Sequence, residues 1–312
     1  MQNSAVFDVF INDKPLTHMK KIEIKLPNTL APAKSILIDY HVPEQRTSYK
    51  TPVIVFLHGF KGFKDWGAFD QLAQIWTQKG FLVFKVSFSH NGTTAENPVD
   101  FEDLEAFGQN TITKELSDTA TVINFIYNKN SDLPKRNIED IRLVGHSRGG
   151  STAIIYASKD QRIKKVITLS AVSDLEKRYF NEQNKKQWHS KGVVIIKNGR
   201  TNQDMPLFES FYEDFKKQPQ NYSVKDATEK LARVKMPQLI IHGADDQSVT
   251  QQDAEEIYEW TNTGTNPNQN AKLVLIEKAD HTYNTKHPNL ISNIEELPTP
   301  FLEMANLVTK FE

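Results

Sequence analysis

One serine in this chain lies in a setting that can make it a nucleophile. Residues 145–149 read Gly-His-Ser-Arg-Gly, which fits the pattern G-x-S-x-G. That pattern describes a sharp strand-to-helix turn that exposes the central hydroxyl. The flanking glycines remove Cβ atoms that would clash in so tight a turn. An apolar strand candidate before the motif and a helix candidate after it support this interpretation, so Ser147 is the predicted nucleophile.

A serine hydroxyl needs a neighbouring base, and the base needs an orienting acid. After G-x-S-x-G turns, the acid and then the histidine follow the serine in chain order. His281 follows a strand candidate at 273–276 after a short turn, whereas His287 precedes Pro288 at the expected start of the last helix. We favour His281 as the base and keep His287 as the alternative.

The acid is expected just beyond the strand candidate that ends at His242. Residues 243–249 read Gly-Ala-Asp-Asp-Gln-Ser-Val and offer both Asp245 and Asp246. A buried carboxylate there can accept a hydrogen bond from the histidine Nδ1 and fix its tautomer. Spacing alone does not separate the two aspartates.

Acyl transfer also requires two backbone N–H donors for the developing oxyanion. One is the N–H of Arg148, the residue after the predicted nucleophile. The other is expected in the loop after the strand candidate 53–57, where His58-Gly59-Phe60 follows. The N–H of Phe60 is our candidate for the second donor.

Short apolar runs alternate with amphipathic segments along most of the chain. Strands are expected at 21–26, 35–40, 53–57, 81–86, 141–144, 165–169, 237–242 and 272–276, and helices at 66–79, 112–127, from 151 onward, 250–260 and over most of 290–311. The polar residues 93–110 are expected to form a surface loop. Repeated strand–helix units predict a mostly parallel sheet with helices on both faces.

The alternation of strands and helices is interrupted between the strands expected at 165–169 and 237–242. A connection there would normally take two to six residues, so residues 173–233 are interpreted as an insertion. It has a strand-and-turn pattern at 193–199 and an aromatic stripe at 207–215 with helical spacing. The predicted organisation is a core of residues 1–172 and 234–312 with a cap formed by 173–233.

Composition excludes several classes of function. The 312 residues carry a formal net charge of -1, which gives no reason to expect nucleic acid as a partner. With no cysteine, a thiol nucleophile and disulfides are excluded. Residues 1–13 lack the pattern of a secretory leader, and no stretch has the apolar length of a membrane span. A cytoplasmic protein is the resulting expectation.

The chain resembles α/β-hydrolase fold serine hydrolases of the dienelactone-hydrolase-like and esterase-like branch. The likeness covers about residues 50–290 and rests on the motifs at 58–60, 145–149, 242–249 and 279–281. It implies an α/β-hydrolase fold with Ser147 as nucleophile, His281 as base and Asp246, not Asp245, as acid. Dienelactone hydrolases proper use a cysteine as nucleophile, and this chain has none.

Other conspicuous residues give weaker predictions for the substrate pocket. His90 and Asn91 end a central strand candidate, and Phe208 and Phe211 belong to the aromatic stripe of the insertion. Each pair either faces substrate or serves a turn or ordinary packing. The Arg148 side chain either ties down a loop or faces an acidic substrate. No His/Asp cluster has metal-ligand spacing, so neither a metal nor another cofactor is expected.

These residues together predict a serine hydrolase that cleaves small carboxylic esters through an acyl-enzyme. A peptidase, amidase or thioesterase would use the same triad, because the triad does not encode the leaving group. A catalytically silent binding protein on this fold is the alternative from another class, since a fold does not fix a function.

Overall fold

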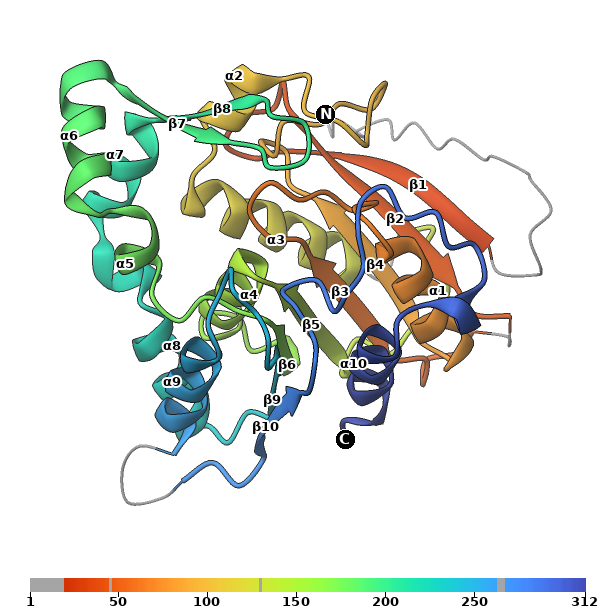
Figure 1. Ribbon diagram of the computed structural model, residues 1–312. Coiled ribbons are helices and arrows are strands. Elements are labelled where there is room, and N and C mark those ends of the chain that lie inside the picture. Colours follow the sequence, from red (N-terminus) through yellow and green to blue (C-terminus); the bar gives the residue numbers. More distant parts are fainter. Residues whose placement is uncertain (1–19, 45–46, 129–130, 263–266) are drawn as a thin grey trace, which may run out of the picture.

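The computed structural model describes residues 20–44, 47–128, 131–262 and 267–312 (Figure 1). The first residues of the chain, on which the expectation about a secretory leader rests, lie outside this part. Within it, eight strands form one sheet in the order β1-β2-β4-β3-β5-β6-β9-β10. Their bounds are β1 Lys20–Pro27, β2 Ser35–Val42, β3 Val53–Leu57, β4 Leu82–Ser87, β5 Ile141–His146, β6 Ile163–Leu169, β9 Gln238–Gly243 and β10 Ala271–Ile276. All eight expected strands are therefore confirmed.

The sheet is mostly parallel, as predicted. The six strands from β4 to β10 run parallel to their neighbours, and β2 and β1 add an antiparallel edge. All the carboxyl ends of the parallel strands therefore meet at one edge, where ligand sites form in open α/β sheets. The loops that follow β3, β5, β9 and β10 carry the candidate site residues to this edge.

Helices cover both faces of the sheet (Figure 1). The central strand β3 is buried on both sides: Val55 packs into one apolar cluster, and Ile54 and Phe56 pack into the other. The first cluster includes residues of α3 Ile112–Tyr127, α4 Arg148–Ala157, α8 Val224–Arg233 and α9 Gln251–Thr261, and the second includes residues of α1 Phe69–Gln78 and α10 Thr299–Lys310. The continuous apolar runs of the sequence reflect this two-sided burial.

A buried charge network joins the antiparallel edge to the parallel core. The fully buried Asp39 of β2 lies 2.9 Å from Lys64 Nζ and 3.3 Å from Lys85 Nζ. Lys85, from β4, also contacts Asp65 at 2.6 Å and Asp70 at 2.8 Å. Burial lowers the pKa of Lys85, but the carboxylates of these three aspartates outweigh it and raise that pKa above its usual range. The lysine therefore stays charged and compensates the buried carboxylates.

One group of side chains in the described ranges has the geometry of a metal site. Asp39, His41 and Asp70 bring their ligand atoms within 4.8 Å of one another. However, Lys21 Nζ lies 3.1 Å from Asp39 and 2.9 Å from Asp70, and Lys85 contacts the same two carboxylates. Ammonium groups thus occupy the place of a cation, so we assign no metal to this cluster.

Residues 173–233 form secondary structure of their own between β6 and β9. The elements are α5 Leu175–Tyr179, α6 Glu182–Lys191, β7 Val193–Lys197, β8 Asp204–Phe208, α7 Glu209–Lys217, the short 3-10 helix η1 Pro219–Tyr222, and α8. Strands β7 and β8 form an antiparallel hairpin separate from the main sheet. The last helix, α8, packs against α4 and α9 and so belongs to the layer that covers the sheet.

Three local predictions differ from the structure. Leu207 and Phe208 belong to strand β8, because pairing with β7 supplies their backbone hydrogen bonds, and only the rest of the stripe is helical. The last helix spans 299–310 and not most of 290–311, because a residue before proline disfavours helical angles and Leu297 before Pro298 is extended. His287 consequently lies in a loop. The loop expected at 93–110 contains the short helix α2 Leu104–Gly108, capped by Asp103.

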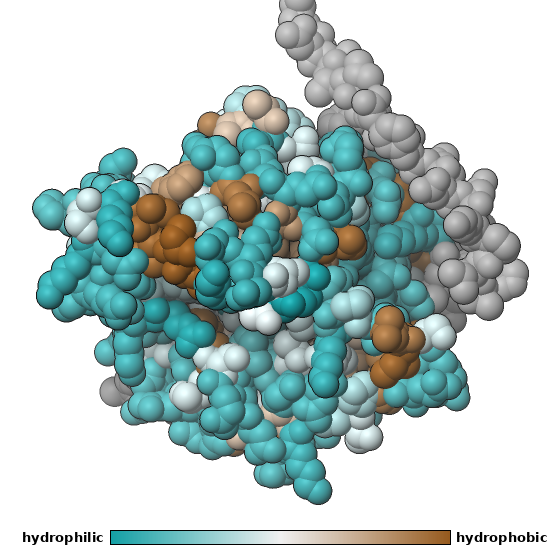
Figure 2. Space-filling model, turned by 45° about the horizontal axis from the view of Figure 1, so that its top comes forward, coloured by the Kyte–Doolittle hydropathy of each residue, from teal (hydrophilic) through white to brown (hydrophobic). Residues whose placement is uncertain are grey.

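Among the described residues, no helix has the length and apolar character needed to cross a membrane. Figure 2 shows a face that is mostly hydrophilic, with hydrophobic side chains in small separate groups. Scattered apolar groups of this kind are normal on a protein surface.

We predict that Asp39→Ala lowers the free energy of unfolding by about 3 kcal/mol, because removing one member of a buried ion network leaves its partners uncompensated. Urea denaturation measures the change. Glu213→Gln is the control, since Glu213 pairs with Lys216 on the surface, and it should leave the urea midpoint unchanged. Equal midpoints for all three proteins would contradict the importance of the buried network.

Candidate active site

The turn around Ser147 has the strained geometry that its sequence predicts. Ser147 lies between β5 and α4 with φ 55° and ψ -124°, in a region that residues other than glycine rarely adopt. A Cβ on Gly145 would lie 2.1 Å from the Gly149 carbonyl oxygen, and a Cβ on Gly149 would lie 2.5 Å from the carbonyl oxygens of Leu57 and His58. Glycine is therefore required at both positions, and helix α4 begins directly after the serine.

The loop after β3 passes directly beside the serine. A Cβ on Gly59 would lie only 2.7 Å from Ser147 Cβ and 3.3 Å from its Oγ. This close approach brings the peptide that links Gly59 to Phe60 next to the hydroxyl. The N–H groups of Phe60 and Arg148 thus belong to the two backbone segments that flank Ser147.

His58 fixes the orientation of that peptide. The backbone N–H of Phe88 donates to His58 Nε2 at 3.2 Å, so the ring proton is on Nδ1, which donates to the Gly59 carbonyl oxygen at 2.8 Å. Burial lowers the pKa of His58 to about 4. The ring is neutral near neutral pH and holds the Gly59 carbonyl on the side opposite to the Phe60 N–H.

His281 and Asp246 are hydrogen-bonded. Nδ1 of His281 donates to Asp246 Oδ2 at 2.7 Å, while the other carboxylate oxygen accepts from the backbone N–H groups of Ser248 and Val249 at 2.8 and 2.9 Å. Burial raises the pKa of Asp246, but hydrogen bonds from His242 and His281 outweigh it and hold that pKa well below its usual range. Asp246 is therefore an anionic partner, with its remaining lone pairs satisfied.

The alternatives kept open for the acid and the base lie elsewhere. Asp245 is exposed and its backbone N–H donates to the Ala279 carbonyl oxygen. His287 accepts a hydrogen bond from the backbone N–H of Gly67 at 2.9 Å, and its ring lies against Trp66. Of the two aspartates, Asp246 contacts His281, and of the two histidines, His281 lines a cavity with Ser147.

His146 holds the histidine loop from the serine side. Its Nε2 donates to the His281 carbonyl oxygen at 2.8 Å, and the two ring centroids are 4.8 Å apart. Burial, with a smaller contribution from His281, lowers the pKa of His146 to about 3. His146 is thus a neutral donor that links β5 to the loop after β10.

The Arg148 side chain is tied into the protein. Its guanidinium forms a buried ion pair with Glu115 of α3 and stacks on the Phe60 ring, 4.6 Å from the centroid. Glu115 also accepts hydrogen bonds from Asn110 and Thr152. Of the two sequence-based alternatives for this side chain, the contacts support the one in which it anchors a loop. The side chains of both candidate oxyanion residues therefore lie in one stack.

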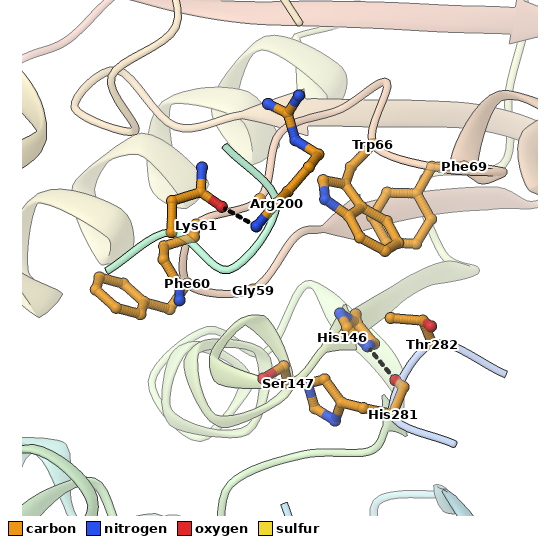
Figure 3. Close-up of a pocket in the computed structure, with 12 residues that line it drawn as sticks. Gly59, Phe60, Lys61, Trp66, Phe69, His146, Ser147, Arg200, His281 and Thr282 are labelled. Atoms are coloured by element: carbon orange, nitrogen blue, oxygen red, sulfur yellow. Dashed lines mark hydrogen bonds between the residues drawn. The ribbon is translucent and has the colours of Figure 1, made fainter. Parts of the chain in front are cut away.

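A cavity of about 230 Å³ opens above the serine. Figure 3 shows Ser147 and His281 on one side of it, and Lys61, Arg200, Trp66 and Phe69 on the opposite side. The lining residues are Gly59, Phe60, Lys61, Gly62, Trp66, Phe69, His146, Ser147, Asn198, Arg200, His281 and Thr282.

The four residues suggested for the substrate pocket are not among those that line this cavity. His90 bonds to Ser89 Oγ, and the Asn91 amide donates to the Gly62 carbonyl oxygen at 3.2 Å, so Asn91 supports the loop beside the serine. The Phe208 ring packs against Gly108 of α2, and Phe211 is buried among aromatic side chains of the insertion.

The sequence analysis did not predict the cavity-lining residues that lie outside the motifs of the candidate site. Lys61 follows directly after Phe60, so its position next to a candidate site residue could have indicated that it lines the cavity. Trp66 and Phe69 lie where the helix candidate begins, and Asn198 and Arg200 lie in the turn of the β7–β8 hairpin. Nothing in the sequence indicates that this distant turn folds over the loop after β3.

Two of the buried histidines, His58 and His146 beside the serine, should make the protein sensitive to acid. An unfolded histidine has a pKa of about 6.5, so the unfolded chain binds protons that native His58 and His146 do not. Their contribution to stability is complete above about pH 6.5 and is lost as the pH falls toward the native values of about 4 and about 3. We predict that His146→Gln loses less unfolding free energy than wild type between pH 7 and 4.5.

Urea denaturation at several pH values measures this difference, which approaches about 1.4 kcal/mol per pH unit for one proton. His189→Gln is the control, because His189 is exposed. The prediction is wrong if the wild type and His146→Gln lose stability in parallel.

Comparisons with known proteins agree with this fold and identify the family of the chain. A search of curated protein sequences finds no match. Solved structures with the same fold include Est1E from Butyrivibrio proteoclasticus, at 17% identity and a TM-score of 0.64, with 92% of this chain and 97% of that chain covered. The esterase domain of a Rhodothermus marinus protein matches at 16% identity and a TM-score of 0.58, covering 93% and 96% of the two chains.

Dienelactone hydrolase from Anabaena variabilis matches at 15% identity and a TM-score of 0.54, covering 94% and 97%. At such identities these structures show the fold, which is that of the α/β hydrolases. The family model described as "Putative esterase" matches residues 31–289, which include every residue of the candidate site. The chain therefore belongs to this esterase family.

Proposed function

We propose that this protein is a serine hydrolase that cleaves carboxylic esters through an acyl-enzyme. The main observation in support is that Ser147, in a strained turn, lines the same cavity as His281. Nδ1 of His281 donates a hydrogen bond to the buried Asp246. A serine, a histidine and a carboxylate in these relations are the parts needed to activate a hydroxyl.

Each step of the proposed reaction uses one of these groups. His281 Nε2 takes the proton of Ser147 Oγ as the oxygen attacks the ester carbonyl carbon. The N–H groups of Phe60 and Arg148 stabilise the oxyanion of the tetrahedral intermediate. His281 then gives the proton to the leaving alkoxide, and the same base activates the water that releases the acid from Ser147.

Asp246 remains ionised during this cycle. Its depressed pKa fits a group that orients the imidazole and stabilises its charged form without accepting the proton. His58 and Glu115 act indirectly: one orients the Gly59–Phe60 peptide, and the other anchors the side chain that stacks on Phe60. We further propose that residues 173–233 act as a cap, because the β7–β8 turn supplies part of the cavity lining.

Ser147→Ala should reduce ester hydrolysis by a factor on the order of 10⁶, because the members of a triad act as a unit. Rates with 4-nitrophenyl esters measure the loss, and circular dichroism checks that the variant is folded. A fluorophosphonate should label the wild type at Ser147 and leave the variant unlabelled.

A folded wild type that neither hydrolyses esters nor accepts the probe would favour a catalytically silent binding protein. Labelling at Ser147 together with turnover of peptide anilides or acyl thioesters, but not of oxygen esters, would replace the ester assignment by a peptidase or thioesterase. If Ser147→Ala keeps a tenth of the wild-type activity, the assignment of Ser147 as the nucleophile is wrong.

Asp246→Asn should lower kcat by about 10⁴, because an amide of the same shape disrupts the tautomer that His281 needs. Asp245→Asn is the matched control on the adjacent residue, and it should cost less than about tenfold because Asp245 is exposed. Parallel kinetics on one ester compare the two variants. The opposite ranking would assign the role of the acid to Asp245 instead of Asp246.

A further inference from the structure

The wall of the cavity opposite the catalytic pair is built from two distant segments. Lys61 belongs to the loop after β3, and Arg200 belongs to the turn of the β7–β8 hairpin (Figure 3). Asn198, which also lines the cavity, lies in the same turn. Lys61 Nζ donates to the Lys197 carbonyl oxygen at 3.1 Å, which fastens the hairpin over the loop. All three residues therefore border the same cavity as Ser147 and His281.

Asn198 has hydrogen-bond donors without a partner in the described part of the protein. The residue is 7% exposed, and its Oδ1 accepts from the backbone N–H of Arg200 at 3.2 Å. That contact identifies Oδ1 as the acceptor. The other atom of the amide, the donor nitrogen Nδ2, is buried and has no hydrogen-bond partner among the described residues. A buried donor without an acceptor costs free energy, so the position suits an acceptor that arrives with a ligand.

The charge of the same wall is positive. Lys61 and Arg200 line the cavity, and none of its lining residues is an aspartate or glutamate. Burial, with a smaller contribution from the charge of Arg178, lowers the pKa of Lys61. Arg200 Nη2 contacts the exposed Asp100 at 2.6 Å, which uses part of a guanidinium that carries five N–H donors.

We propose that Lys61, Asn198 and Arg200 form an anion subsite, and that the preferred ester carries a carboxylate or a similar anionic oxygen group close to the scissile bond. This inference rests on the proposed ester hydrolysis. Two cations and an unpaired amide donor match the acceptor oxygens of such a group. The cavity volume of about 230 Å³ limits the spacer between the anion and the ester carbonyl to a few atoms.

Matched ester pairs test the subsite from both sides of the scissile bond. On the acyl side, the 4-nitrophenyl monoester of adipic acid is compared with 4-nitrophenyl hexanoate, in which a methyl group replaces the carboxylate. On the alcohol side, 4-(carboxymethyl)phenyl butyrate is compared with 4-ethylphenyl butyrate. The measured quantity is the ratio of kcat/KM for the charged ester to that for the neutral ester, after subtraction of the enzyme-free rate.

We expect wild type to favour the charged ester in at least one pair. Arg200→Gln, Lys61→Met and Asn198→Leu should each lower that ratio by roughly tenfold, the effect of losing one charge-assisted hydrogen bond. The ratio should also fall as salt is raised, because the cations are partly exposed. Lys197→Gln is the matched control: it removes one positive charge from the same hairpin, but its side chain pairs with Asp204 and does not line the cavity.

The outcomes separate this inference from the proposed function. If Ser147-dependent hydrolysis occurs but neither pair shows a preference for the charged ester, the anion subsite is wrong and the hydrolase stands. The subsite is equally wrong if Lys197→Gln lowers the ratio as much as Arg200→Gln does, since a general surface potential then explains the preference. If folded wild type hydrolyses none of the four esters, both proposals are overturned.

Discussion

The candidate site depends on how closely three backbone segments approach around Ser147. The turn after β5, the start of α4 and the loop after β3 lie within contact distances that only glycine permits at positions 59, 145 and 149. This crowding imposes the strained backbone angles of the serine. The apolar strands β3 and β5, buried on both faces, hold the segments in place against that strain.

Buried histidines complete the frame at the carboxyl edge of the sheet. His58 orients the peptide next to the serine, His146 holds the His281 carbonyl, and His242 donates to the Val249 carbonyl oxygen in the loop that carries Asp246. Each ring joins a strand end to a loop that must be positioned accurately. His58 and His146 are neutral because burial disfavours the charged imidazolium.

The insertion contributes to the site at its hairpin turn, whereas its aromatic side chains stabilise the insertion itself. Phe180, Trp188 and Phe211 pack against one another, and the Trp188 indole donates to the Leu207 carbonyl oxygen. The β7–β8 turn extends from this packed base to the loop after β3. The turn therefore lines the cavity, while the aromatic side chains of the insertion pack against one another.

The sequence alone determined most of the strands and helices and predicted the residues of the candidate site. Apolar runs located the strands, because burial on both faces leaves a local pattern, and the chain order of Ser147, Asp246 and His281 follows from the order of the strands that carry them. Tertiary structure decided what depends on contacts between distant segments. It placed Asp246, the aspartate that the resemblance implied, against His281 and left Asp245 exposed. It also paired Arg148 with Glu115 and brought Asn198 and Arg200, not Phe208 and Phe211, into the cavity lining. No local pattern records such contacts, because the free energy of each comes from a partner far away in the chain.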